Sequence, residues 1–307
     1  MPSFSTKIKE EILRKPVRNR RSAALLFAGL TYTCGGIRIG SSPFLVYKTE
    51  LEALANYIAK YAAQFYQTDT QTELRHTAWR KTPLYRVALT GEGIYPLLEE
   101  SGLATRDAEG SLRLRGMGEG LSAAGQKSFL QGCFLGSGVC GNPNSVYRAE
   151  ILFRSEAAAA AALQMLQANG LSAAITERRE QALLYLNDAD NVAGLLALLG
   201  YSAGVFEIYN TKAEKTLRNN ENRRENCDAA NADKALTAAA RQVYAIQTIQ
   251  KQRGLHTLPA SLRTAAALRL ENPYATLPEL ALIEGIGKSG MNHRLARLIE
   301  LAAEMEV

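Results

Sequence analysis

The sequence predicts an α+β protein in which two tandem αββαββα repeats form a pseudo-dimer, followed by a separate all-α domain that contains a helix-turn-helix. Two observations lead to this fold class. A nine-residue pattern of small and apolar residues occurs twice, and the segments after each copy have the same order of strand-like and helix-like character. Near the C-terminus, three helix signals follow one another closely, and a glycine-containing turn separates the last two.

The repeated pattern occupies residues 27–35 and 130–138. Its glycines match twice at one common offset, and the third residue of each copy is a glycine, Gly29 or Gly132. The seventh residue is also small. A spacing of four residues places both small positions on one helix face, where two backbones can approach closely. We therefore expect the two pattern helices to pack against each other.

The remaining elements follow from periodicity and from turn and capping residues. A small amphipathic helix is expected to begin at Phe4. After the first pattern we expect strands at 37–39, 44–49, 72–78 and 84–90 and helices at about 51–65 and 94–100; after the second, strands at 146–153, 173–177 and 183–187 and helices at 155–170 and 192–199. Each half therefore reads as one αββαββα unit.

The C-terminal third begins with a polar run and continues with helices. An amphipathic helix is expected from about Asp233 to Arg253, with Leu236, Ala240, Val243 and Ile246 on its packed face and Gly254 as its stop. Pro259 lies in the first turn of a helix that reaches about Glu271, and Thr276 and Glu279 form a capping box for a short helix. The turn at 284–287 then leads into a last helix that reaches Met305.

These signals divide the chain into four parts. They are an N-terminal helix and basic arm at 1–21, the tandem-repeat domain at 22–209 with repeats at about 22–104 and 125–205, a basic linker at 210–232, and the helical domain at 233–307.

Composition excludes several classes of protein. A hydrophobic content of 47% supports packed cores and excludes a disordered chain. No apolar run is long enough to span a bilayer and no signal peptide is indicated, so we expect a cytoplasmic protein without a membrane partner. The four cysteines form no CxxC pair and the three histidines lie far apart in the sequence, so neither a metal site nor a disulfide framework nor any other cofactor is indicated.

The net charge of +6 is concentrated at the two ends of the chain. Between Glu11 and Glu50 the sequence has no acidic residue, but it has seven basic ones: Arg14, Lys15, Arg18, Arg20, Arg21, Arg38 and Lys48. Such a segment can bind phosphates through counterion release, and it is equally compatible with a solvated surface or with a face that docks another domain.

The last helix has two distinct faces. Met291, Leu295, Leu298 and Ala302 form an apolar stripe for the core. The other side is polar near the end that would enter a major groove: the predicted base-reading residues are Ser289, Asn292, His293 and Arg297. Asparagine can pair with adenine and arginine with guanine, whereas Lys288 and Arg294 are better placed for phosphates. A purely structural three-helix bundle is the alternative.

The nine-residue pattern resembles the LAGLIDADG motif of homing endonucleases, whose two motif helices pack at a pseudo-twofold axis beneath a saddle of β-sheets. In that family the acid at position eight holds the divalent metals that cleave DNA. Here position eight is Cys34 in the first motif and Ser137 in the second, and no acid lies nearby in either window. The resemblance therefore implies a saddle without catalytic residues.

Further segments make the chain similar to the WhiA family, in which a degenerate homing-endonuclease domain precedes a helix-turn-helix. These are Ser3–Lys7, Asn222–Cys227, Arg269–Pro273 and Lys288–Leu295. The resemblance implies a transcription regulator that binds double-stranded promoter DNA in the nucleoid, is associated with cell division, chromosome segregation or sporulation, and has a co-regulator or RNA polymerase as possible partner.

Phosphate contacts are predicted for Lys288 and Arg294, for Arg223 and Arg224 in the linker, and for Arg18, Arg20 and Arg21 in the arm. Two other hypotheses remain open. The chain could be a protein-interaction scaffold with weak, non-specific DNA binding, or an active homing endonuclease, which the missing acids disfavour.

Overall fold

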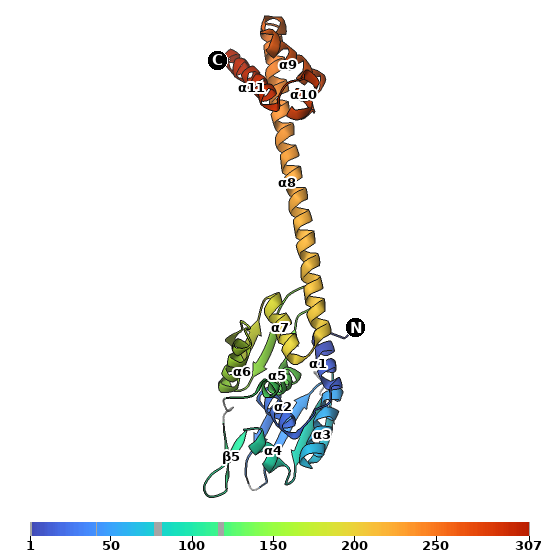
Figure 1. Ribbon diagram of the computed structural model, residues 1–307, viewed down its shortest axis with the longest axis vertical. Coiled ribbons are helices and arrows are strands. Elements are labelled where there is room, and N and C mark those ends of the chain that lie inside the picture. Colours follow the sequence, from blue (N-terminus) through green and yellow to red (C-terminus); the bar gives the residue numbers. More distant parts are fainter. Residues whose placement is uncertain (1, 41, 77–81, 116–119, 307) are drawn as a thin grey trace. The chain divides into compact units, whose positions relative to one another are not determined.

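A computed structural model describes residues 2–40, 42–76, 82–115 and 120–306, with the side chain of residue 306 left out. The chain divides into two compact units, residues 1–215 and 216–307, which are described separately below. The division falls within the segment that we predicted as a basic linker. Figure 1 labels the helices and strands in chain order.

The first half of the tandem-repeat unit has the predicted order of elements. They are α1 (Phe4–Arg14), α2 (Arg20–Thr33), β1 (Gly35–Arg38), β2 (Phe44–Thr49), α3 (Glu52–Tyr66), β3 (Asp69–Arg75), β4 (Leu84–Thr90) and α4 (Ile94–Glu100). A hairpin of β5 (Ala104–Arg106) and β6 (Leu112–Leu114), which the sequence analysis did not predict, follows α4. Strand β3 begins three residues earlier than the predicted strand at 72–78, and residues 77–78 of that prediction lie outside the described residues.

The second half repeats this order. Its elements are α5 (Ala123–Ser137), β7 (Val139–Cys140), β8 (Ala149–Phe153), α6 (Glu156–Ala168), β9 (Ala174–Arg178), β10 (Gln181–Leu186) and α7 (Ala189–Leu199). The two antiparallel sheets have equivalent orders, β1-β2-β4-β3 and β7-β8-β10-β9. This matched topology confirms the tandem αββαββα fold. The predicted strand at 146–153 is too long, because residues 142–148 form a turn and loop before β8.

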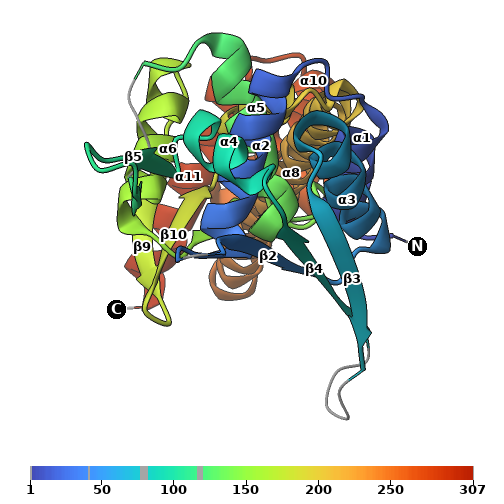
Figure 2. The same cartoon turned by 90° about the horizontal axis from the view of Figure 1, so that it is seen from below.

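Helices α2 and α5 pack against each other through the glycines of the repeated pattern. A Cβ atom on Gly29 would lie 2.3 Å from the carbonyl oxygen of Phe129, and one on Gly132 would lie 2.1 Å from that of Leu26. Both distances are shorter than any real carbon–oxygen contact, so only glycine allows this approach. Figure 2 shows the two helices side by side. The predicted backbone contact is therefore confirmed.

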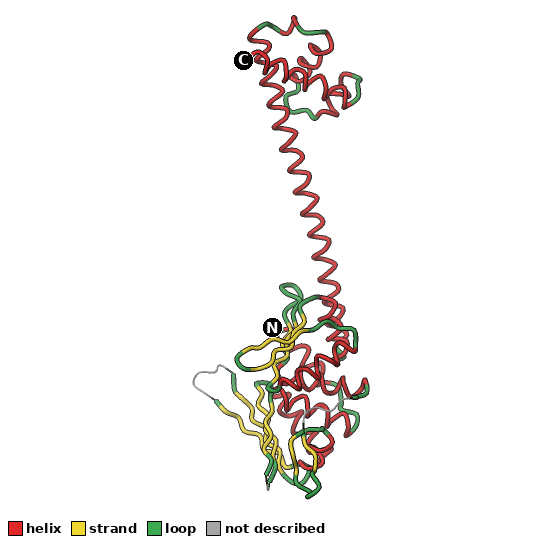
Figure 3. The backbone as a smooth tube through the Cα atoms, turned by 90° about the vertical axis from the view of Figure 1, so that its left-hand side faces the viewer, coloured by secondary structure: helices red, strands yellow, loops and turns green. Residues whose placement is uncertain are grey.

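The two sheets have one buried and one exposed face. In β2 the side chains of Leu45 and Tyr47 are fully buried, whereas Lys48 is exposed, as expected for the period-two alternation of a strand. Figure 3 shows the strands of this unit on one side and most of its helices on the other. Helix α1 belongs to the helical side: Ser3 caps its first turn, and Phe4, Ile8 and Ile12 enter the core.

Helix α8 (Ser202–Gln252) contradicts two expectations. The helix begins at Ser202, not at about Asp233, because no glycine or proline follows Gly204 until Gly254 and the linker is rich in helix-compatible arginine, glutamate and alanine. The packed face is also different. Ala239, Gln242, Ala245, Ile246 and Ile249 are buried, whereas Leu236 and Ala240 are exposed.

The second unit is helical. After the end of α8 come the short 3-10 helix η1 (Leu255–Thr257), α9 (Ala260–Glu271), α10 (Leu277–Glu284) and α11 (Lys288–Glu306). Their core joins Ile246 and Ile249 of α8 to Leu280 of α10 and to the apolar stripe of α11. This arrangement confirms a separate all-α domain. Among the described residues, no helix is both long and apolar enough to cross a membrane.

Candidate nucleic-acid interface

Local sequence determines the turn between α10 and α11. The backbone N–H and the hydroxyl of Thr276 both donate to the Glu279 carboxylate, at 2.7 and 2.8 Å, and these bonds hold the pKa of Glu279 below its usual value. Gly285 ends α10 with φ 74°, a left-handed conformation that favours glycine. The capped short helix, the glycine turn and the longer helix together form a helix-turn-helix.

Helix α11 separates a buried face from a polar one. Met291, Leu295 and Leu298 have no exposed surface. Ser289, Asn292 and His293 are exposed, and among the described residues their side chains have no hydrogen-bond or ion-pair partner in the protein. Together with the exposed Lys288 at the first position of the helix, they form a polar surface at its N-terminal end. The chemistry needed to read base edges is therefore available there.

The two arginines of α11 are bound within the protein. Arg294 donates to the partly buried carboxylate of Glu284 at the end of α10, so its guanidinium connects the two helices of the motif. Arg297 donates to Glu300 at 2.8 Å and to Glu304 at 3.5 Å, and the Glu300 hydrogen bond is the main reason that the pKa of Arg297 is raised. Both residues would have to exchange these partners to contact DNA.

Arg269 connects α9 to the loop before α10. Only 1% of its surface is exposed, and Nη1 donates to the carbonyl oxygens of Asn272 at 3.3 Å and Ala275 at 2.6 Å. Burial lowers its pKa. The arginine thereby fixes the loop that positions Thr276 for capping.

Arg223 and Arg224 lie on the fully exposed middle of α8. The guanidinium of Arg224 is 4.0 Å from the carboxylate of Asp228 one helical turn later, and both side chains are mostly in solvent. An ion pair this exposed contributes little to stability. Both arginines therefore remain available to an anionic partner.

The three arginines of the N-terminal arm differ in whether their side chains are bound within the protein. Arg20 forms a bidentate ion pair with Glu100, at 3.0 Å for each contact, and its guanidinium lies 4.8 Å from the centre of the Tyr66 ring. Arg21 donates to the backbone carbonyl of Glu100. Arg18 is exposed and has no such partner among the described residues. Arg20 and Arg21, two of the three arginines predicted to contact phosphates, thus connect the start of α2 to the end of α4.

Cys34 lies at the end of α2, where the motif of homing endonucleases has an acid. Its thiol is buried, and burial raises its pKa to about 11, while the charges of Lys9 and Arg154 lower it. The thiol is therefore neutral near pH 7. Two cations beside a neutral thiol provide neither the charge nor the oxygen ligands that Mg²⁺ requires.

Ser137 lies at the end of α5, at the equivalent position of the second motif. Its hydroxyl donates to the carbonyl oxygen of Leu152 at 2.7 Å and accepts from the N–H of the same residue at 3.0 Å. Both bonds attach the helix to β8. Across the part of the chain that the structure describes, no group of three His, Cys, Asp or Glu residues could hold a metal ion.

A hollow of about 330 Å³ lies on the exposed sheet face beside Cys34. We call it the Cys34 hollow. Four cationic side chains line it: Arg38 on β1, Lys48 on β2, Arg86 on β4 and Arg154 after β8. None of its described lining residues is acidic, although Arg86 pairs with Glu73 at 3.1 Å. Arg154 also donates to the carbonyl oxygen of Gly35 at 2.7 Å. Positively charged side chains thus surround the position at which the LAGLIDADG motif of homing endonucleases binds divalent metal ions.

The sequence analysis missed Arg86 and Arg154. Arg38 and Lys48 were noted within the basic segment, but their neighbours lie outside it. For Arg154 the signal is the alternation along β8, which continues past the buried Phe153 and places Arg154 on the opposite face. Strand β4 gives no such signal for Arg86, because Val87, Ala88 and Leu89 are all buried. On the second sheet, Arg148 and Arg178 both pair with Glu150, so this part carries less free charge.

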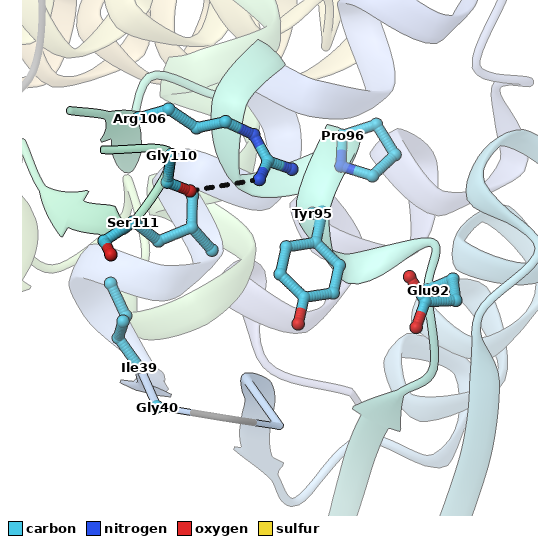
Figure 4. A pocket seen from close by; sticks show the side chains of 9 residues that line it. Ile39, Gly40, Glu92, Tyr95, Pro96, Arg106, Gly110 and Ser111 are labelled. Carbon is cyan, nitrogen blue, oxygen red and sulfur yellow. Dashed lines mark hydrogen bonds between the residues drawn. The ribbon is translucent and has the colours of Figure 1, made fainter. Parts of the chain in front are cut away.

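A larger hollow, of about 740 Å³, lies between α4, the β5–β6 hairpin and the end of β1 (Figure 4). Its cation is fully engaged: Arg106 donates to Glu99 and to the carbonyl oxygen of Gly110, and its guanidinium lies 5.4 Å from the centre of the Tyr95 ring. Since Glu92 also lines it, this hollow does not favour an anionic ligand.

Comparison with known proteins gives consistent results for both units. A family model described as the WhiA C-terminal HTH domain matches residues 222–302, and one described as the WhiA LAGLIDADG-like domain matches residues 126–218. Among curated proteins, the "probable cell division protein WhiA" of Clostridium botulinum is 31% identical over 313 residues, and that of Clostridium tetani 29% over 311 residues; each match covers 99% of this chain and 98% of the relative.

Solved structures show the same fold. Full-length DUF199/WhiA from Thermotoga maritima aligns with a TM-score of 0.63 and 24% identity, covering 99% of both chains. The N-terminal LAGLIDADG domain of DUF199/WhiA aligns with a TM-score of 0.53 and 19% identity, covering 65% of this chain and 91% of the other.

Proposed function

Because the chain belongs to the WhiA family, we propose that it is a sequence-specific, non-enzymatic DNA-binding transcription regulator that acts in cell division. The observation that carries this proposal is the exposed polar surface of α11, formed by Ser289, Asn292 and His293 on a helix whose other face is buried. The family resemblance extends the proposal to chromosome segregation or sporulation, with promoter DNA in the nucleoid as the ligand.

Helix α11 is the proposed recognition helix. Its N-terminal residues would contact base edges, as the second helix of a helix-turn-helix does in a major groove. Arg297 would join them by exchanging Glu300 and Glu304 for a guanine. Lys288, Arg223 and Arg224 would contact phosphates. Because the Arg294 side chain is tied to Glu284, its larger contribution is to hold the motif together.

The tandem-repeat unit would add phosphate contacts through its sheet face. Arg38, Lys48 and Arg154 carry three positive charges without an acidic partner in the Cys34 hollow. Each phosphate that such a group neutralises releases counterions and strengthens binding at low salt. Arg18 would contribute in the same way at the arm, whereas Arg20 and Arg21 are held by Glu100. The family resemblance adds a co-regulator or RNA polymerase as a proposed partner.

The proposal of no nuclease activity rests on position eight of the two motifs. A neutral thiol at Cys34 and a hydroxyl bound to Leu152 at Ser137 cannot replace two metal-binding carboxylates. A magnesium titration on plasmid DNA tests this directly. Metal-dependent nicking that persists in the Cys34→Ala and Ser137→Ala variants would show that another site cleaves DNA.

The decisive experiment selects bound fragments from genomic DNA with the full chain, an Asn292→Ala variant and a Gln247→Ala control. Gln247 carries the same amide on the exposed surface of α8. We expect wild type and control to enrich one motif, and Asn292→Ala to lose discrimination at one base pair, by about 1–3 kcal/mol. Enrichment of the unchanged motif by Asn292→Ala would contradict the recognition helix.

The scaffold hypothesis makes a different prediction. Binding through phosphates alone should disappear when random competitor DNA is added in excess and should depend steeply on salt, whereas sequence-specific binding resists the competitor. If the wild-type chain enriches no motif and the competitor removes all binding, the scaffold hypothesis replaces the proposal.

A further inference from the structure

A second cationic hollow lies on the helical side of the tandem-repeat unit. Its volume is about 540 Å³, and it lies between the α1–α2 connection, α2, α3 and α5. We call it the Lys127 hollow. It is next to the first turns of α2 and α5, whereas Cys34 and Ser137 lie at the far ends of these helices. Leu26 of the Lys127 hollow comes eight residues before Cys34, so about 12 Å of helix separates the two hollows.

One wall of the Lys127 hollow is apolar. Ile12, Val17 and Leu26 contribute aliphatic groups, and Tyr57 contributes an aromatic ring that is almost entirely buried. The tyrosine is held from behind by Tyr61, whose ring centre is 4.6 Å away in an edge-to-face arrangement. A hollow of this size, in the range of about 300–1,000 Å³ typical of small-molecule sites, can accommodate a flat, partly apolar group against such a wall.

The rim of the same hollow is cationic. Lys15, Arg18 and Lys127 line it, and none of its described lining residues is acidic. The ammonium groups of Lys127 and Lys15 converge, since they lie 3.1 Å and 3.5 Å from the point that a Cβ atom on Gly200 would occupy. Two like charges this close repel each other, so their convergence is unfavourable until an anion arrives.

Intramolecular partners offset only part of this charge. Lys15 donates to the carbonyl oxygen of Gly200 and lies 3.4 Å from Glu11, a carboxylate that it shares with Arg14. Among the described residues, Arg18 and Lys127 have no ion pair. The hydrogen bond to Gly200 also orders the Lys15 side chain, which reduces the entropy lost when a ligand binds.

We propose that the Lys127 hollow binds a nucleoside diphosphate. Three cations match the roughly three negative charges that two linked phosphates carry near neutral pH. The apolar wall next to the cations fits a nucleobase. Duplex DNA is too wide to enter a hollow of this volume, so a backbone phosphate could reach only its rim. The site shares Arg18 with the proposed DNA contacts, and its other lining residues lie outside them.

Isothermal titration calorimetry of the full chain with ADP tests the proposal, with adenosine and inorganic phosphate as partial ligands. We expect ADP to bind one site per chain and each partial ligand to bind at least tenfold more weakly. Lys127→Gln and Arg18→Gln should each weaken ADP binding by about tenfold, the loss expected for one charge-assisted contact. Both residues are exposed, so neither substitution threatens the fold.

Arg38→Gln is the matched control, because it removes one charge from the Cys34 hollow. It should leave ADP binding unchanged. Three results would overturn the proposal: no binding of ADP, GDP, CDP or UDP at millimolar concentration, binding that survives both Lys127→Gln and Arg18→Gln, or binding that Arg38→Gln abolishes. A fourth is stoichiometric displacement of ADP by duplex DNA in wild type but not in Lys127→Gln, which would assign the hollow to backbone phosphate.

Discussion

The contact between α2 and α5 makes a strong prediction about Gly132→Ala. A Cβ atom there would lie 2.1 Å from the carbonyl oxygen of Leu26 and 3.0 Å from its carbonyl carbon. Both are backbone atoms, so no side-chain rotation can relieve the overlap. To reach an ordinary contact of about 3.4 Å, the helices must separate by about 1 Å along their shared core.

Two effects oppose each other in this variant. Alanine favours the helix by about 1 kcal/mol over glycine. Separating two tightly packed helices costs more, because overpacking typically costs about 1–3 kcal/mol and here the strain acts along a whole interface. Taking the upper end of that cost, less the gain in helix propensity, we expect the variant to lose about 2 kcal/mol in the free energy of unfolding of the tandem-repeat unit. Steric overlap therefore outweighs helix propensity.

Urea denaturation checks this magnitude, and hydrogen exchange of peptides from α2 and α5 locates the loss. Gly290→Ala is the control, because a Cβ atom on this glycine of α11 would meet only a side-chain atom of Ile286, at 3.8 Å. For Gly290→Ala we expect only the effect of helix propensity, a rise of about 1 kcal/mol in the free energy of unfolding. If Gly132→Ala proved as stable as wild type while Gly290→Ala showed its gain, the two backbones would not be in contact and the reasoning would fail.

Three further predictions concern single side chains. Arg269→Met should lower the free energy of unfolding of the helical unit by about 2 kcal/mol, because two loop carbonyls lose a charged donor; thermal denaturation measures this, and an unchanged midpoint would contradict it. Because burial raises the thiol pKa of Cys34 to about 11, iodoacetamide at pH 8 should alkylate the exposed Cys227 and leave Cys34 unmodified until the chain unfolds; mass spectrometry distinguishes the two, and early labelling of Cys34 would refute its burial. Lys48→Gln should reduce the salt dependence of DNA binding by about one counterion, whereas Lys60→Gln on α3 should not; equal slopes would exclude the sheet face from the interface.

Much of the fold could be predicted because short-range patterns specify it. The repeated nine-residue pattern predicted the contact at Gly29 and Gly132, and the Thr276–Glu279 pair together with Gly285 predicted the turn of the helix-turn-helix. Helix α8 was misjudged because polarity was taken as evidence of a linker. A polar sequence without glycine or proline remains helical when its residues have good helix propensity.

The candidate site could be predicted only in part. The sequence placed Ser289, Asn292 and His293 on the face of α11 opposite its core, because helical periodicity is a local property. It could not show that Arg294 is bound by Glu284 or that Arg20 is bound by Glu100, since these partners lie 10 and 80 residues away. Ion pairing between distant residues depends on packing, so the availability of a charge cannot be read from its position in the chain.

The sequence by itself determined which functional groups each position carries. Position eight of the two motifs, Cys34 and Ser137, has no metal-binding acid, and the start of the last helix has polar residues that can contact base edges. Only the tertiary structure decided where charge gathers. The Cys34 hollow joins cations from β1, β2 and β4 to Arg154 of the second repeat, and the Lys127 hollow joins Lys15 of the N-terminal arm to Lys127 of the second repeat. The physical reason is that electrostatic interactions depend on distance in space, and the packing of α2 against α5 sets that distance.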